Sequence, residues 1–209
     1  MASDDPYQIL NETALSECYR EPSEHVRKAT LDFLHDFHIA YLKVAPLVCL
    51  ASGASDGYDV SPRGGEPGFV RVLDRRTLAI PDFPGNNKIE TLRNLVRDER
   101  IALLFLFPGL DIFMRVAGRA TVTRRPELLS MMSCAGKAPI TVIVVKTEAV
   151  YFHCGRAISR SRIWDSATHI AREAVPSPGA MIKALAQIAD MGSEELDLLY
   201  RRGMTEELY

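Results

Sequence analysis

Three consecutive polar residues, Asn86, Asn87 and Lys88, lie between an apolar segment and a segment with helical spacing. The run that contains them, TLAIPDFPGNNKIETLRNLV, reads as a buried strand, a turn rich in Pro, Gly and Asn, and a helix that begins at the lysine. The first turn of a helix presents unpaired backbone N–H groups and roughly half a positive charge, so it binds a phosphate readily. The sequence therefore predicts an anion site here, with an ordinary asparagine-capped turn as the alternative.

Two arginines upstream strengthen the prediction of an anion site. Arg63 lies in the flexible segment SPRGG, and Arg71 lies in a short apolar segment that reads as a strand. Because both precede the turn that carries Lys88, we expect three cationic side chains to converge on one phosphate.

The composition sets limits on the protein class. The chain has 209 residues, a net charge of −2 and 47% hydrophobic residues, which suffices for the core of one domain. This charge balance argues against a general nucleic-acid or acidic-membrane surface. No apolar run reaches the roughly 18 residues that span a bilayer, and the N-terminal residues are acidic and polar, so we expect a cytoplasmic protein. The four cysteines are widely spaced without a C-x-x-C pair, so we expect reduced, mostly buried thiols.

The elements that must position these residues are mostly strands. An apolar face predicts one helix over residues 23–43. Six apolar segments bounded by turn residues predict strands at residues 47–51, 69–73, 77–80, 101–107, 111–123 and 140–154. Few helices separate them, so we expect a largely antiparallel sheet that closes into a barrel or a split barrel. We predict three parts in one globular unit: a helical extension at residues 1–44, the barrel at residues 45–165 and a helical segment at residues 166–209.

Two elements next to the predicted site have distinctive patterns. In residues 111–123 apolar residues alternate with others, which places Arg115 and Arg119 on one face of a strand. Helical spacing in residues 88–97 predicts a buried face made of Ile89, Leu92, Leu95 and Val96.

Other catalytic chemistry has little support in the sequence. The zinc-hydrolase and phosphate-loop patterns H-E-x-x-H, G-x-x-x-x-G-K-[ST] and G-x-G-x-x-G are absent. His153 and Cys154 are adjacent in a strand and point to opposite faces, so we expect a structural role for them. A metal could bind His35 and His38, one helical turn apart, but no third ligand is evident. Arg156 and Arg160 share one side of a short helix, where a substrate anion or solvent would face them.

Four ordered segments resemble the FMN-binding split barrel of the pyridoxamine 5'-phosphate oxidase-like flavoproteins. They are SPRGG followed by FVRVLDRRTLAIPDFPGNNK, then IALLFLF, then RVAGRATV, and finally YFHCGRAISRSRIW, within residues 45–165. The last segment resembles an FMN-dependent subgroup of unassigned substrate, which often has lysine in place of Arg156. The resemblance implies a six-stranded antiparallel split β-barrel, mainly β with N-terminal and C-terminal helices. It also implies a homodimer with FMN at the subunit interface.

The resemblance also implies which residues hold the cofactor. In the family, basic side chains of one barrel and the start of the following helix bind the phosphate; the matching residues here are Arg63, Arg71, Asn86, Asn87 and Lys88.

Further residues match positions near the flavin ring. Pro81 and Asp82 match the strand end whose backbone hydrogen-bonds the polar edge of the isoalloxazine ring, and Arg115 of the Arg-Val-x-Gly strand points toward the same groove. A C-terminal aromatic or arginine of the partner subunit often reaches the cofactor. The candidates for that role are Trp164, Arg160 and Arg162.

The chain departs from authentic pyridoxamine phosphate oxidases. It lacks their Arg-x-Val-Leu-Leu-Lys strand and their Arg-Leu-His-like substrate motif, and Phe113 stands where they place a glutamine. We therefore expect an FMN-dependent oxidoreductase of unassigned substrate, acting on a small aromatic or heteroaromatic compound or on a nicotinamide cofactor. The alternatives are a non-catalytic FMN or haem binding protein, an enzyme that uses the deazaflavin F420, and a dimeric structural module with an empty pocket.

Overall fold

The computed structural model describes residues 7–9, 11–206 and 208. The chain divides into two compact units, Met1–Thr30 and Leu31–Tyr209. Within the described residues of the first unit, the helices are α1 (Glu12–Cys18) and α2 (Glu24–Lys28), neither of which has a buried residue.

The second unit contains the sheet. In chain order its elements are α3 (Asp36–Leu42), β1 (Leu47–Ala54), β2 (Gly57–Gly64), β3 (Arg71–Asp74), β4 (Thr77–Asp82), α4 (Glu90–Arg97), β5 (Arg100–Leu106), β6 (Ile112–Thr123), α5 (Pro126–Met131), β7 (Thr141–Cys154), α6 (Arg156–Ser161), two 3-10 turns (Ser166–Thr168 and Arg172–Ala174), α7 (Pro178–Leu185) and α8 (Ser193–Thr205). Among the described residues, none of the helices is both long enough and apolar enough to cross a membrane.

The strands form one sheet in the order β2-β1-β5-β6-β7-β4-β3, and every neighbouring pair is antiparallel. The predicted fold class, mainly β and antiparallel with flanking helices, is confirmed, although the described residues contain seven strands and not six. The strand that the sequence pattern missed is β2, because Pro62 and its glycines read as a turn. A proline is tolerated there since β2 lies at an edge of the sheet.

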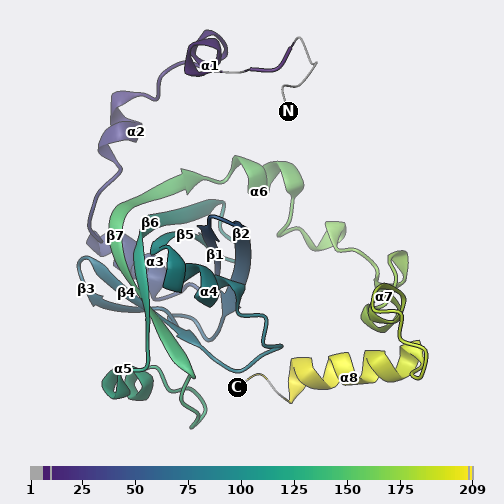
Figure 1. The fold of residues 1–209 in the computed structure, drawn as a ribbon. Coiled ribbons are helices and arrows are strands. Elements are labelled where there is room, and N and C mark those ends of the chain that lie inside the picture. The colour runs from purple at the N-terminus through teal and green to yellow at the C-terminus, as the bar shows by residue number, and fades with distance from the viewer. Residues whose placement is uncertain (1–6, 10, 207, 209) are drawn as a thin grey trace. The chain divides into compact units, whose positions relative to one another are not determined.

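Alternate residues of the strands point into one core. On β6, Met114, Val116 and Ala120 are buried whereas Arg115 and Arg119 are exposed, which confirms the predicted alternation. The same core takes side chains from β1, β4, β5 and β7, so the sheet curves around it, as Figure 1 shows. Its largest fully buried members include Leu50, Leu78, Ile80, Leu103, Phe105 and Ile143.

Gly118 allows β7 to approach β6 closely. The pairing of these strands shifts register between Ala117 and Gly118. A Cβ atom on Gly118 would lie 2.0 Å from the carbonyl oxygen of Lys146, which no side chain tolerates. This contact is the physical reason for the glycine in the RVAG segment.

The predicted continuous helix over residues 23–43 is wrong. Leu31 and Val150 exchange two backbone hydrogen bonds of 3.0 and 2.6 Å, and the Leu34 N–H donates to the carbonyl of Arg75 at 2.7 Å. These pairings with β7 and with the β3–β4 turn take the backbone groups that a helix would use. Helical structure resumes only at Asp36.

The outward-facing residues of β2, β1, β5, β6 and β7 form a surface that we call the outer face. Cross-strand pairing aligns them in three rows, which are mostly apolar and only partly buried. The rows are Val60, Ala51, Ala102, Ala117 and Ala149; Pro62, Cys49, Leu104, Arg115 and Tyr151; and Gly64, Leu47, Leu106, Phe113 and His153.

The four cysteines are free, and the expectation that most are buried is wrong. Cys18 and Cys154 are exposed, and Cys49 and Cys134 are partly buried.

Candidate functional site

A cavity of about 470 Å³ lies where the ends of β2 and β4 meet the loop that leads to α4. Its lining includes six of the eleven residues named as candidates for binding a cofactor: Arg63, Pro81, Asp82, Asn86, Asn87 and Lys88. The structure thus brings together the two segments, SPRGG and PDFPGNNK, from which the anion site was predicted. That these residues hold a cofactor stays a prediction.

The loop before α4 has the geometry of a turn. The Asn86 side-chain oxygen accepts a hydrogen bond of 3.0 Å from the Lys88 N–H, and Asn87 has a left-handed backbone with φ of 60°. This conformation cannot belong to a helix, so α4 begins at Glu90, two residues later than predicted. Lys88 is therefore an exposed side chain at the rim of the cavity and not part of the first helical turn.

The buried face of α4 is partly polar, which the sequence pattern did not predict. Ile89 and Val96 were expected to be buried, but their side chains are 39% and 79% exposed. The residues that α4 buries are Thr91, Asn94 and Leu95.

Two hydrogen bonds hold this polar face on the sheet. The Thr91 hydroxyl donates to the Asp59 carboxylate at 2.7 Å, and the Asn94 side-chain amide donates to the Ser52 hydroxyl at 3.2 Å. These bonds fix α4, and with it the loop that lines the cavity. A signal for this polar contact was present in the sequence. Polar residues alternate along residues 57–64, so reading that segment as a strand would have placed Asp59 on an inward face.

Arg63 and Asp82 form an ion pair inside the cavity. The distance from Arg63 Nε to Asp82 Oδ1 is 2.9 Å, and the two side chains are only 20% and 12% exposed. Arg63 Nη1 also donates to the carbonyl of Pro62 at 2.9 Å. The carbonyl of Asp82 accepts from the Ile140 N–H at 2.9 Å, which ties the end of β4 to the start of β7.

The described lining has three charged side chains, Arg63, Asp82 and Lys88, which give a net charge of +1 (two positive and one negative). Lys88 is exposed and takes part in no described ion pair, whereas Arg63 is compensated by Asp82. A phosphate group fits this arrangement, because Lys88 offers a cation and the loop offers turn backbone and two asparagine amides.

The other five candidate cofactor residues lie outside this cavity. Arg71 lines a neighbouring cavity of about 80 Å³, whose lining shares Gly64, Gly65, Pro81 and Phe83 with the larger one. Arg115 lies on the outer face, with its guanidinium 5.3 Å from the ring centre of Tyr151.

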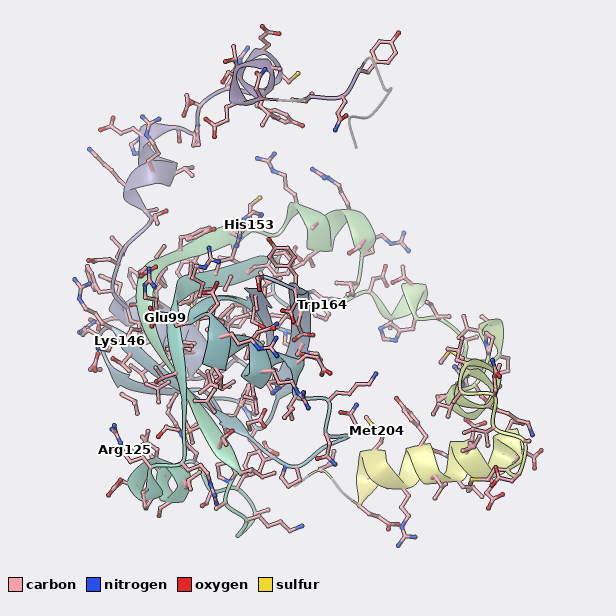
Figure 2. All side chains as sticks on the ribbon, in the orientation of Figure 1. Glu99, Arg125, Lys146, His153, Trp164 and Met204 are labelled. Carbon is pink, nitrogen blue, oxygen red and sulfur yellow. The ribbon has the colours of Figure 1, made fainter. Side chains whose placement is uncertain are left out.

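Arg160 and Trp164 lie beyond the end of β7. Arg160 is exposed on α6. The indole N–H of Trp164, labelled in Figure 2, donates to the carbonyl of Leu110 at 3.1 Å, which links the segment after α6 to the β5–β6 turn. Trp164 thus anchors the segment after α6, and Arg162, which ends α6, pairs with Asp165 at 3.4 Å. A role of Arg160, Arg162 or Trp164 toward a partner subunit's cofactor stays a prediction.

Histidines and cysteines form no metal centre in the described part of the chain, where no group of three or more possible ligands was found. His38 is buried against the ring of Phe152, and its Nδ1 accepts the backbone N–H of His35 at 3.1 Å. Burial, and secondarily the proximity of His35, lowers the pKa of His38 below its ordinary value. His38 is thus a packed residue that caps α3.

The sequence model described as pyridoxamine 5'-phosphate oxidase matches residues 34–154 of the chain, which is more than half of it. The chain therefore belongs to the pyridoxamine 5'-phosphate oxidase family, as the four ordered segments suggested. The matched region contains the whole sheet and all charged residues of the cavity.

Solved structures with related folds have low sequence identity. A variant of HupZ from Group A Streptococcus is 14% identical over 57% of this chain and 98% of its own, with a TM-score of 0.47. An FMN-binding protein from Syntrophomonas wolfei is 13% identical over 54% and 81%, with a TM-score of 0.42. A NimC/NimA family protein from Clostridium acetobutylicum is 17% identical over 57% and 86%, with a TM-score of 0.41. Curated proteins gave no match.

Proposed function

We propose that this protein is an FMN-binding flavoprotein that acts as an FMN-dependent oxidoreductase on a small substrate, and that it works as a homodimer with the cofactor at the subunit interface. The observation that carries the proposal is the cavity between β2, β4 and the loop before α4, which places an uncompensated lysine beside a turn and two asparagine amides. Membership of the pyridoxamine 5'-phosphate oxidase family supports the choice of a flavin.

In this proposal the chain's own residues bind and orient the cofactor. Lys88 and the amides of Asn86 and Asn87 would hold the phosphate, and Arg63 would add one hydrogen bond from Nη2, which has no partner among the described residues. The backbone groups of Pro81 and Asp82 would lie along the ring, while the Asp82 side chain stays paired with Arg63. When bound, the flavin supplies the redox chemistry, so no catalytic acid or base of the protein is required.

The outer face supports the dimer. Its first row consists of Val60 and four alanines, and its other rows add leucine, phenylalanine, tyrosine and proline side chains. A contiguous, largely apolar surface of this kind marks an interaction site. A second copy of the chain would cover it through the same residues, because homodimer interfaces are usually two-fold symmetric and more apolar than the remaining surface.

The experiment that tests the function is a visible absorption spectrum of the purified protein before and after addition of FMN, followed by gel filtration. We expect flavin bands that stay with the protein and that bleach when NADPH is added without oxygen. A Soret band would indicate haem, and retention of F420 in place of FMN would indicate a deazaflavin enzyme. A colourless protein that retains none of these ligands would contradict the proposal and favour the structural module.

A further inference from the structure

Asp82 is an acidic residue in a cavity suited to an anion. Its side chain is 12% exposed, and one of its oxygens, Oδ1, accepts the Nε–H of Arg63 at 2.9 Å. Because both residues line the cavity, a bound phosphate would meet the arginine and the carboxylate together. The carboxylate lowers the lining charge from +2 to +1, counting Arg63 and Lys88 as positive.

We propose that Asp82 sets the strength and the selectivity of this site: it neutralises Arg63, so that the phosphate is held mainly by Lys88 and a phosphorylated flavin is bound less tightly than the two cations alone would bind it. This inference rests on the proposed flavin binding. It adds that Asp82 controls how strongly the site prefers FMN over riboflavin.

Electrostatics gives the direction of the effect. A like charge within about 4–6 Å changes the proton affinity of a group by 1–3 pKa units, which corresponds to a factor of about ten or more in binding. The carboxylate of Asp82 and a phosphate that also contacts Arg63 would share one guanidinium, and both are negative. The low exposure of the ion pair limits screening by solvent.

The same contact would also allow Asp82 to strengthen phosphate binding, and the two roles can be told apart by experiment. If Asp82 served only to orient Arg63 toward the phosphate, its removal would weaken binding. The two roles therefore predict changes of opposite sign for the same substitution.

The experiment compares Asp82→Asn with the wild-type protein by fluorescence titration with FMN and with riboflavin. Asparagine keeps a side-chain oxygen that accepts the Arg63 Nε–H. We expect FMN to bind at least about tenfold more tightly and to dissociate more slowly, with riboflavin affinity unchanged because riboflavin lacks the phosphate. Asp32→Asn is the matched control, since the Asp32 carboxylate also pairs with an arginine, Arg76, at 2.7 Å but lies outside this cavity's lining.

A second set of variants tests the same idea if Asp82→Asn folds poorly. Arg63→Gln alone leaves the lining with a net charge of 0, and we expect FMN affinity to fall at least about tenfold. The double variant with Asp82→Asn returns the net charge to +1, and we expect it to bind FMN at least about tenfold more tightly than Arg63→Gln alone, since the carboxylate that repels the phosphate is gone. A double variant no better than Arg63→Gln, or an Asp82→Asn variant with unchanged or weaker FMN binding, would overturn the inference. If the wild-type protein binds no FMN, the proposed function itself fails.

Discussion

Arg63 of β2 and Asp82 of β4 form an ion pair between strands that are not neighbours in the sheet. In the sheet order, four strands (β1, β5, β6 and β7) separate β2 from β4, yet the Nε–Oδ1 distance is 2.9 Å. A flat sheet cannot bring these strands together, so the ion pair marks the place where the curved sheet closes on itself. The same two residues line the candidate site. The contact that closes the barrel therefore lies beside the place where we propose that a ligand binds.

Removal of the carboxylate should destabilise the barrel. We expect Asp82→Ala to lower the free energy of unfolding by about 3 kcal/mol, since it leaves a mostly buried arginine without its partner. Urea unfolding followed by circular dichroism measures this change. Asp56→Ala is the control, because Asp56 pairs with Arg97 at 2.7 Å but both side chains are more than half exposed, and we expect a loss below about 1 kcal/mol. Equal losses in the two variants would contradict a closing role for Asp82.

Loss of Lys88 should weaken FMN binding and leave folding intact. We expect Lys88→Ala to reduce the binding free energy by about 1–3 kcal/mol, the range for a charge-assisted hydrogen bond. Its side chain is exposed, so the midpoint of thermal unfolding without ligand should not change. Lys146→Ala, which removes an exposed lysine of β7 outside the cavity lining, should leave FMN affinity unchanged. Equal affinity of Lys88→Ala and wild type would remove this loop as the phosphate site.

Gly118 should tolerate no side chain. We expect Gly118→Ala to destabilise the protein by about 3 kcal/mol or more, because its Cβ would lie 2.0 Å from the backbone oxygen of Lys146 and would force β7 away from β6. Differential scanning calorimetry tests this against Gly203→Ala in α8, where no atom lies within 4 Å of the new Cβ. In that helix we expect a gain of about 0.5–1 kcal/mol.

The stability of the fold should depend on His38 at mildly acidic pH. Its native pKa lies below the ordinary value because of burial, so the unfolded state binds the proton more tightly. The corresponding stability is fully present above the unfolded pKa of about 6.5 and is lost as the pH falls through the native pKa.

We expect the difference in unfolding free energy between pH 7.5 and pH 5.5 to shrink in His38→Gln, which keeps an acceptor for the His35 N–H. Urea titrations at both pH values measure it. Replacing the exposed His25 of α2 by Gln should leave the difference as it is in wild type, and a His38 variant with the full difference would show that other groups cause it.

A charge in the middle of the outer face should separate the dimer. Ala102 lies in β5, the middle one of the five strands that form the outer face, and in the row that contains the four alanines. We expect Ala102→Arg to sediment as a monomer at concentrations where the wild type is a dimer, since an unpaired buried charge costs several kcal/mol. Thr121 is exposed near the end of β6 and belongs to none of the three rows. We expect Thr121→Arg to sediment as the wild type does. A monomeric wild-type protein would refute the dimer itself.

The parts of the fold that follow from local patterns were predictable. The alternation in residues 111–123 correctly separated Met114 from Arg115, because one face of β6 packs in the core. The turn before α4 was located because Pro, Gly and Asn are turn residues whatever their surroundings, whereas the binding of an anion there stays a prediction. The family resemblance then gave the fold class, an antiparallel split barrel with flanking helices, but not the order of the strands in the sheet.

The parts that depend on distant partners were not predictable. Nothing in SPRGG shows that Arg63 meets Asp82, since the contact exists only after the sheet has closed. The break in the predicted helix at residues 29–35 depends on Val150, more than a hundred residues away in sequence. The burial of Thr91 and Asn94 likewise depends on hydrogen bonds to the first two strands, which override the apolar pattern of α4.

Pro62 also bears on how the protein avoids aggregation. It lies in β2, a strand with neighbours on one side only, and a proline has no N–H to offer an incoming strand. This edge is therefore a poor template for strand addition by another chain. In the proposed dimer, copies of the protein would therefore meet through side chains of the outer face, where contact ends with two subunits, and not through backbone pairing that continues into a fibre.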